Sequence, residues 1–235
     1  MKLIVEDLRK TFEEKEVLKG ATFTFEQGKI YGLLGRNGAG KTTFFNCINE
    51  DIGFDSGSFE IEDKDQLRGV TSDDIGYVLS TPTVPEFLTA REFLKFFIDI
   101  NLGKIKNLKT IDEYLDFMMI ETDDRDKLLK DYSHGMKNKM QMLVNFIADP
   151  TILLLDEPLT SFDVVVADEM KQLLRQIKND HIIIFSTHIL ELAIDLCDEI
   201  VILNNGVLSE IQKNSLNSAE YKEKIIETLK GENNE

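Results

Sequence analysis

Residues 30–43 read IYGLLGRNGAGKTT, and this stretch decides the fold. It opens with an apolar run of β-strand character, passes through a loop with three glycines and ends on Lys41-Thr42-Thr43, before the largely apolar residues 44–48. This order predicts a strand, a phosphate-binding loop and a helix. The segment Gly35–Thr42, called the phosphate loop below, matches G-x-x-x-x-G-K-[ST] at every fixed position.

The residue types in the phosphate loop suit a polyphosphate. A loop that wraps phosphates must bring several backbone N–H groups to one point, and a Cβ at the closest positions would block that approach. Lys41 adds a mobile positive charge for the β- and γ-phosphates, and the Thr42 hydroxyl is placed to bind Mg²⁺. The candidate nucleotide-binding residues here are Gly35, Arg36, Asn37, Gly38, Ala39, Gly40, Lys41, Thr42 and Thr43. The alternative is a glycine-rich turn with an incidental lysine.

Two further apolar runs end in polar side chains. Residues 152–155 lead into Asp156-Glu157, and residues 182–185 lead into Ser186-Thr187-His188. Carboxylates at the carboxyl end of a buried strand lie where open α/β sheets bind ligands. We expect Asp156 to hold Mg²⁺, directly or through water, and Glu157 to orient and deprotonate the attacking water. A lone histidine is more often structural, but three strand ends converging on one nucleotide favour a contact from His188 to the γ-phosphate.

The order of patterns along the chain predicts the fold class. Continuous apolar runs flanked by helical segments are typical of a parallel sheet covered on both faces. A capping box at Thr89 and Glu92 opens a helical block inserted between the β-containing halves. We therefore predict a single α/β domain over residues 1–235, of the P-loop NTPase type with a mainly parallel, RecA-like sheet. It has an N-terminal antiparallel β-subdomain, a helical subdomain at about 86–147 and a peripheral tail at about 212–235.

Composition limits the possible partners. The 235 residues are 42% hydrophobic, enough for a full core, and the formal net charge is −16. An acidic surface repels phosphate backbones, so we expect no nucleic-acid partner. Cys47 and Cys197 are too few for a disulfide framework and are expected to be buried thiols. No apolar run approaches the roughly 20 residues that cross a bilayer, and we expect a cytoplasmic chain.

A fourth motif carries a resemblance to a known family. Residues Tyr132-Ser133-His134-Gly135-Met136-Lys137 stand where nucleotide-binding subunits of ATP-binding cassette (ABC) transporters carry a signature usually written LSGGQ. The chain resembles that family over roughly residues 1 to 210. The resemblance implies that Ser133 and the backbone at Gly135 close on the γ-phosphate of ATP held by another subunit. The active unit would be a head-to-tail dimer that encloses two ATP molecules.

The resemblance also implies roles for single residues. Phe12, which the residues alone leave open between core packing and a stacking platform, aligns with the aromatic that stacks on adenine. Asp163, in a segment that resembles the family's D-loop, would reach across the dimer interface. Glu157 would be the general base and His188 the switch histidine. The helical block would carry the signature and form, with the preceding loop, a groove for a helix of the membrane subunit.

The chain departs from the family pattern at two places. Ser80 stands where a glutamine ordinarily binds Mg²⁺ and relays to the membrane subunit, so we expect a water-bridged contact or a weaker metal site. His134 replaces the first signature glycine and Met136 replaces the glutamine. The resulting Y-S-x-G-M-K form resembles the type 2 (ABC-2) exporter branch.

The predicted function is an ATPase subunit with ATP and Mg²⁺ as cofactors. Its expected partners are a transmembrane permease subunit, at the inner face of the cell membrane, and a second ABC subunit in a homodimer or heterodimer. One alternative is a soluble ABC ATPase acting on ribosomes or DNA, which the acidic surface disfavours. Another is a P-loop kinase or GTPase, but those lack the elements at 132–137 and 186–188, and the chain has no guanine-reading N-K-x-D string.

Overall fold

The computed structural model describes residues 1–211 and 218–230. The strands are β1 (Lys2–Phe12), β2 (Lys15–Glu26), β3 (Ile30–Leu34), β4 (Ser56–Asp63), β5 (Gln66–Gly69), β6 (Ile75–Val78), β7 (Ile152–Asp156), β8 (Ile182–Thr187), β9 (Glu199–Asn204) and β10 (Val207–Ile211). The α-helices are α1 (Lys41–Ile48), α2 (Ala90–Asn101), α3 (Ile111–Phe117), α4 (His134–Ala148), α5 (Val164–Ile177), α6 (Leu190–Leu196) and α7 (Ser218–Lys230). Short 3-10 helices are η1 (Ser72–Asp74), η2 (Thr122–Asp124), η3 (Leu129–Asp131) and η4 (Lys178–Asp180).

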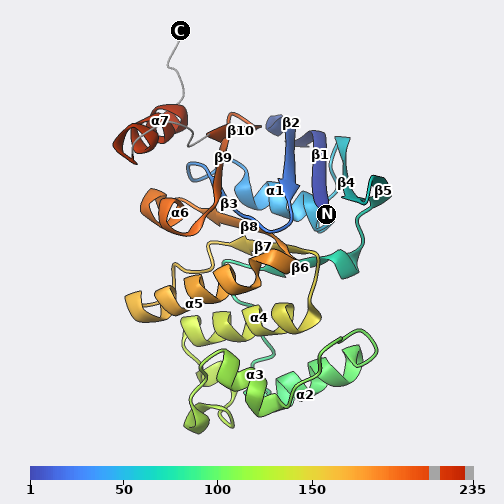
Figure 1. Ribbon diagram of the computed structural model, residues 1–235, viewed down its shortest axis with the longest axis vertical. Helices are drawn as coiled ribbons and strands as arrows, with labels where there is room; N and C mark the ends of the chain where they lie inside the picture. The colour runs from blue at the N-terminus through green and yellow to red at the C-terminus, as the bar shows by residue number, and fades with distance from the viewer. Residues whose placement is uncertain (212–217, 231–235) are drawn as a thin grey trace.

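Two sheets form the framework. An antiparallel sheet has the order β2-β1-β4-β5, and a second sheet has the order β10-β9-β3-β8-β7-β6, with all its neighbours parallel except β10 and β9. In Figure 1 the antiparallel sheet lies at one end of the molecule, α2 and α3 lie at the other, and the parallel strands run between them. The predicted α/β fold class is confirmed.

The parallel sheet is buried on both faces. Leu154 belongs to the core cluster shared with α1 and the antiparallel sheet, whereas Leu153 and Leu155 face the cluster formed with α2 to α5. Because side chains of a strand alternate between its faces, a strand that is covered on both sides reads as one continuous apolar run. This explains why the predicted strands lack a polar alternation. A third cluster packs α6 and α7 against the strands β3, β9 and β10.

Helices α2, α3 and α4 form the block that the sequence places between the β-containing halves. The predicted capping box of α2 is confirmed, since Thr89 accepts from the Glu92 N–H at 3.2 Å and Glu92 accepts from the Thr89 N–H at 2.9 Å. Thr110 and Glu113 form a second capping box at α3. The extent of the helical subdomain stays a prediction.

Two regions refine the predicted organisation. The connection at residues 63–74 contains β5, which pairs with β4, and η1. Buried Asp74 accepts hydrogen bonds from the Arg68 guanidinium at 2.6 and 2.7 Å and from the Thr71 N–H. The predicted peripheral tail contains α7, which buries Tyr221 and Ile225. The other tail residues, 212–217 and 231–235, lie outside the described residues.

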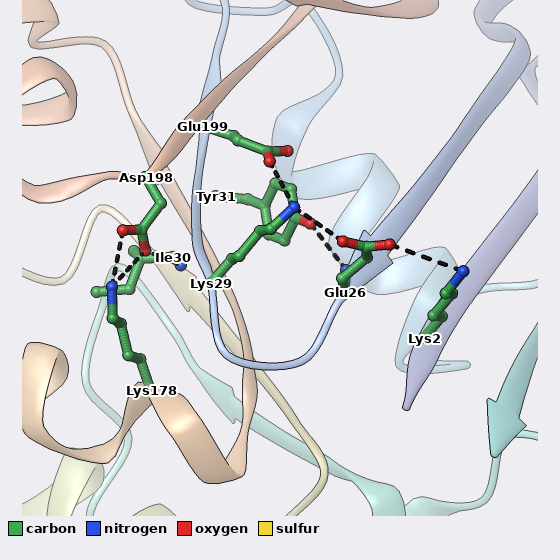
Figure 2. Close-up of polar contacts among 8 residues, drawn as sticks. All are labelled: Lys2, Glu26, Lys29, Ile30, Tyr31, Lys178, Asp198 and Glu199. Atoms are coloured by element: carbon green, nitrogen blue, oxygen red, sulfur yellow. Dashed lines mark hydrogen bonds and ion pairs between the residues drawn. The ribbon is translucent and has the colours of Figure 1, made fainter. Parts of the chain in front are cut away.

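Polar contacts fix the amino end of β3, as Figure 2 shows. The Lys29 ammonium lies 2.8 Å from Glu26 and 2.7 Å from Glu199, so it joins β2 to β9. The Ile30 N–H donates to Asp198 at 2.8 Å. These contacts fix the position of the first residue of β3. The phosphate loop begins directly after the last residue of this strand, so they also help to position the loop. No helix in the two described stretches of chain is long and apolar enough to span a bilayer.

The Arg68–Asp74 contact predicts a pH-dependent stability. Hydrogen bonds from Arg68, reinforced by Thr71, lower the pKa of Asp74 to about 2 from its ordinary 3.8. A lowered folded-state pKa stabilises the fold above the unfolded-state value, and this contribution is lost as the pH falls through the folded-state value. Asp74→Asn should therefore cost about 1 to 3 kcal/mol at neutral pH, with the deficit shrinking between about pH 4 and pH 2.

Urea unfolding at a series of pH values measures this difference. Asp73→Asn is the matched control, because Asp73 lies on the same turn in an exposed ion pair with Lys104 and should change stability little. A deficit of Asp74→Asn that stays constant across this pH range would contradict the prediction.

Candidate active site

The carboxyl ends of three neighbouring strands define the site. β8 lies between β3 and β7, with Leu34 paired to Thr187 and Asp156 paired to Ser186. Because these strands are parallel, the phosphate loop, the acidic pair and His188 emerge at the same edge of the sheet. The structure thus brings together three segments that are far apart in the sequence.

A cavity of about 370 Å³ opens at this edge. Its lining residues are Phe12, Val17, Asn37, Gly38, Gly40, Lys41, Thr42, Thr43, Ser80, Asp156 and Glu157. Three predicted phosphate-loop residues do not line it: Arg36 and Ala39 line the adjoining hollow, and Gly35 lines neither. Cavities of this size hold small-molecule ligands and cofactors.

The phosphate loop has the backbone geometry that its glycines predict. Gly40 adopts φ 106°, and a Cβ there would lie 2.8 Å from a methyl carbon of Val17. Gly40 also precedes α1 and provides no side-chain cap, so the first N–H groups of α1 are left to a ligand. The buried Lys41 ammonium donates to the Gly35 carbonyl at 2.9 Å and lies 4.0 Å from a carboxylate oxygen of Glu157.

Asp156 is held on both of its carboxylate oxygens. The Thr42 hydroxyl donates to Oδ2 at 2.8 Å, and the Ser186 hydroxyl donates to Oδ1 at 2.5 Å. Asp156 is only 2% exposed, so these two hydroxyls provide the hydrogen bonds that a buried carboxylate requires. Ser186 is not among the predicted site residues. The sequence signal is a hydroxyl directly after the apolar run 182–185, but only the strand register opposite Asp156 shows which group it contacts.

Glu157 adopts an unusual backbone conformation beside His188. Its φ is 51°, in the left-handed region that a residue with a side chain rarely enters. Its N–H is directed to Ser186, 3.2 Å from the carbonyl oxygen and 3.1 Å from the hydroxyl. Nδ1 of His188 lies 2.8 and 2.9 Å from the two carboxylate oxygens of Glu157. His188 therefore contacts the predicted base directly.

Two further predicted residues that line the cavity, Phe12 and Ser80, are exposed. Phe12 is 45% exposed, with the Lys10 ammonium 4.9 Å from the centroid of its ring. This exposure argues against the core-packing alternative and leaves the stacking role as a prediction. Ser80 follows the end of β6 and lines the cavity that Thr42 and Asp156 also line.

Ser133, Gly135 and Asp163 do not line this cavity. Ser133 caps α4, with its hydroxyl accepting from the Met136 N–H at 3.2 Å. Asp163 caps α5 by accepting from the N–H groups of Val165 and Val166, each at 3.0 Å. These predicted residues therefore lie at the starts of two helices, outside the cavity.

The starts of α4 and α5 are nevertheless packed together. A Cβ at Gly135 would lie 3.1 Å from the Phe162 ring and 3.2 Å from the Ser161 carbonyl, so a larger residue would have to push these neighbours back by a few tenths of an ångström. The Asn138 amide reaches the Pro158 carbonyl at 2.6 Å. The signature segment and the D-loop segment thus form one surface.

The oxygen donors in the cavity fit Mg²⁺. Within residues 1–211 and 218–230, no group of three or more His, Cys, Asp or Glu side chains is arranged to hold a metal. The Thr42 hydroxyl and the Asp156 carboxylate instead offer one or two ligands beside a cavity. Mg²⁺ is commonly bound in this way, with phosphate oxygens and water completing its coordination.

Comparisons with known proteins agree with this geometry. The family described as ABC transporter matches residues 18–160. The "Uncharacterized ABC transporter ATP-binding protein YxlF" of Bacillus subtilis (strain 168) is 32% identical over 208 residues, which cover 88% of this chain and 69% of that protein. ATP-binding cassette sub-family A member 6 of Homo sapiens is 33% identical, and its match covers 87% of this chain but only 13% of that protein.

A solved structure shows the same fold. It is the dimeric structure of a post-hydrolysis state of the ATP-binding cassette MJ0796 bound to ADP and Pi, with a TM-score of 0.75 at 18% identity. The match covers 89% of this chain and 99% of that one. The resemblance to the family is confirmed, whereas the exporter branch stays a prediction. The chain belongs to the ABC transporter family, and it is an ATP-binding, ATP-hydrolysing protein of that family.

Proposed function

We propose that this chain drives transport, in the export direction, through a separate transmembrane permease by ATP-dependent head-to-tail dimerisation. It would be cytoplasmic and peripheral on the inner face of the membrane through that permease. The observation that carries the proposal is the division of the site residues. The cavity is lined by most of the phosphate loop, by Asp156 and by Glu157, whereas Ser133, Gly135 and Asp163 lie outside it.

The cavity would bind the phosphates of one ATP. The free N–H groups at the start of α1 and the ammonium of Lys41 provide positive potential, and Phe12 at the rim is positioned for the adenine ring. Thr42 and Asp156 would hold Mg²⁺. Ser80, which lines the same cavity, would contact the ion through a water molecule. Bound there, the cation supplies charge that stabilises the transferring phosphoryl group.

Glu157 is the proposed general base. Its carboxylate faces the cavity near Lys41, where it can accept a proton from water that attacks the γ-phosphate. The contacts from His188 Nδ1 orient that carboxylate. The imidazole is half exposed, which leaves it room to turn toward the γ-phosphate when the nucleotide is present.

A second subunit would complete the site. The serine hydroxyl and first N–H groups of the 15-residue α4 suit an anion, yet they lie outside their own cavity. The dimeric ADP and Pi complex of MJ0796 supports such an arrangement. The partner would be a second copy of this chain or a related ABC subunit.

The surface of the helical block supports a permease partner. The side chains of Phe87, Phe96 and Ile100 are exposed on α2 and on the segment that precedes it. Large exposed apolar side chains that gather on one element mark protein contacts. The alternative, a non-transport ABC ATPase acting on ribosomes or DNA, is opposed by the net charge of −16.

Glu157→Gln tests the base and the dimer together. Glutamine keeps the shape of the side chain but accepts no proton, so hydrolysis should fall at least about a hundredfold, within the range of general-base catalysis. Unhydrolysed ATP should then hold the subunits together, and sedimentation with ATP and Mg²⁺ should show a dimer. The same variant with ADP is the control and should remain monomeric. A variant that stays monomeric with ATP at every protein concentration would contradict the proposal.

Lys41→Ala tests the phosphate contact. Removing the ammonium should weaken binding of a fluorescent ATP analogue at least about tenfold, the effect of losing roughly 1.4 kcal/mol. Lys106→Ala is the control, because Lys106 lies in an exposed ion pair with Asp149 away from the cavity. If the Lys41 variant and the wild type bind the analogue with equal affinity, Lys41 does not contact the phosphates and the prediction is wrong.

A further inference from the structure

Ser186 joins the two acidic residues of the site. It is fully buried in β8, between the four apolar residues 182–185 and Thr187. Its hydroxyl donates to Asp156 at 2.5 Å and accepts from the Glu157 N–H at 3.1 Å, while its carbonyl receives the same N–H at 3.2 Å. Ser186 therefore contacts both neighbouring acidic residues, namely the carboxylate of Asp156 and the backbone N–H of Glu157.

The first of these contacts fixes the orientation of Asp156. The carboxylate has one hydroxyl on each oxygen, Thr42 on Oδ2 and Ser186 on Oδ1. In the proposed function Thr42 also binds the metal, so Ser186 is the partner of Asp156 that takes no part in the metal shell. Because Asp156 is 2% exposed, water does not replace a lost partner without rearrangement.

The second contact fixes the backbone of Glu157. A non-glycine residue at φ 51° is strained and persists only where its surroundings hold it. The two oxygens of Ser186 are the acceptors that receive the Glu157 N–H. The direction of the Glu157 side chain follows from this backbone conformation, so Ser186 also aims the base toward the cavity.

We propose that Ser186 is a positioning residue that sets the metal-binding carboxylate and the general base in one mutual geometry. This inference rests on the proposed roles of Asp156 and Glu157. Ser186 does not touch the nucleotide and acts through these two side chains. A purely structural serine would instead only fill space in β8.

Ser186→Ala separates these two roles. The variant should bind an ATP analogue in EDTA within about twofold of the wild type, because the phosphate loop is intact. The ratio of the affinity with Mg²⁺ to the affinity in EDTA, called the magnesium effect below, should fall about tenfold, as expected for a lost hydrogen bond to a charged group. At saturating ATP and Mg²⁺, kcat should fall at least about tenfold with a smaller change in KM. Circular dichroism and a thermal melt would verify that the variant is folded.

Three companion variants sharpen the comparison. Ser186→Thr restores the hydroxyl and should recover most of the magnesium effect, whereas Ser186→Cys keeps the volume but donates only weakly and should behave like alanine. Thr187→Val is the matched control. It removes a buried hydroxyl from the same strand. This hydroxyl accepts from the Ile189 N–H and contacts neither acidic side chain, so the magnesium effect should remain.

The inference is overturned if Ser186→Ala keeps the magnesium effect and kcat within about twofold of the wild type while Asp156→Asn loses both. Failure of the proposed function would look different. The wild type and Asp156→Asn would then respond to Mg²⁺ alike. Asp156 would not bind the metal in that case, and the positioning role of Ser186 would be rejected together with the proposed function.

Discussion

The hydrogen bond from Thr42 to Asp156, 2.8 Å long, joins the start of α1 to the end of β7. It is possible only because β3, β8 and β7 are adjacent and parallel, so that their carboxyl ends meet at one edge. The apolar cores on both faces of the sheet hold these strands in register. The geometry of the site is therefore set by packing that lies beneath it, and the polar groups at the edge are few and closely constrained.

The same edge carries local strain and buried charge. Glu157 lies at positive φ, Lys41 is a buried cation and Asp156 a buried carboxylate. Each of these features costs free energy unless its neighbours compensate, and each is compensated here by a hydrogen bond. Strain and buried charge of this kind concentrate at functional sites, where they fix side chains before a ligand arrives.

Much of this arrangement was predictable from the sequence, for physical reasons. Some requirements act locally and are therefore visible in the sequence. The glycine spacing of the phosphate loop reflects the close approach of the backbone to a ligand, and the uninterrupted apolar runs reflect strands that are buried on both faces. The contact from Ser186 to Asp156 was not predictable, because it depends on which strands pair and in which register. The packing of Gly135 against Phe162 and the ordering of residues 63–74 around Asp74 depend likewise on tertiary contacts.

In the function that we propose, one protomer holds half of the hydrolysis site and a second protomer completes it. The dependence of ATPase activity on protein concentration tests this most directly. If two protomers form each site, the activity per protomer should rise with concentration and level off where the dimer is saturated, with the plateau matching the dimer seen by sedimentation. An activity per protomer that stays constant from dilute monomer to concentrated protein would contradict the claim, because a single protomer would then be sufficient.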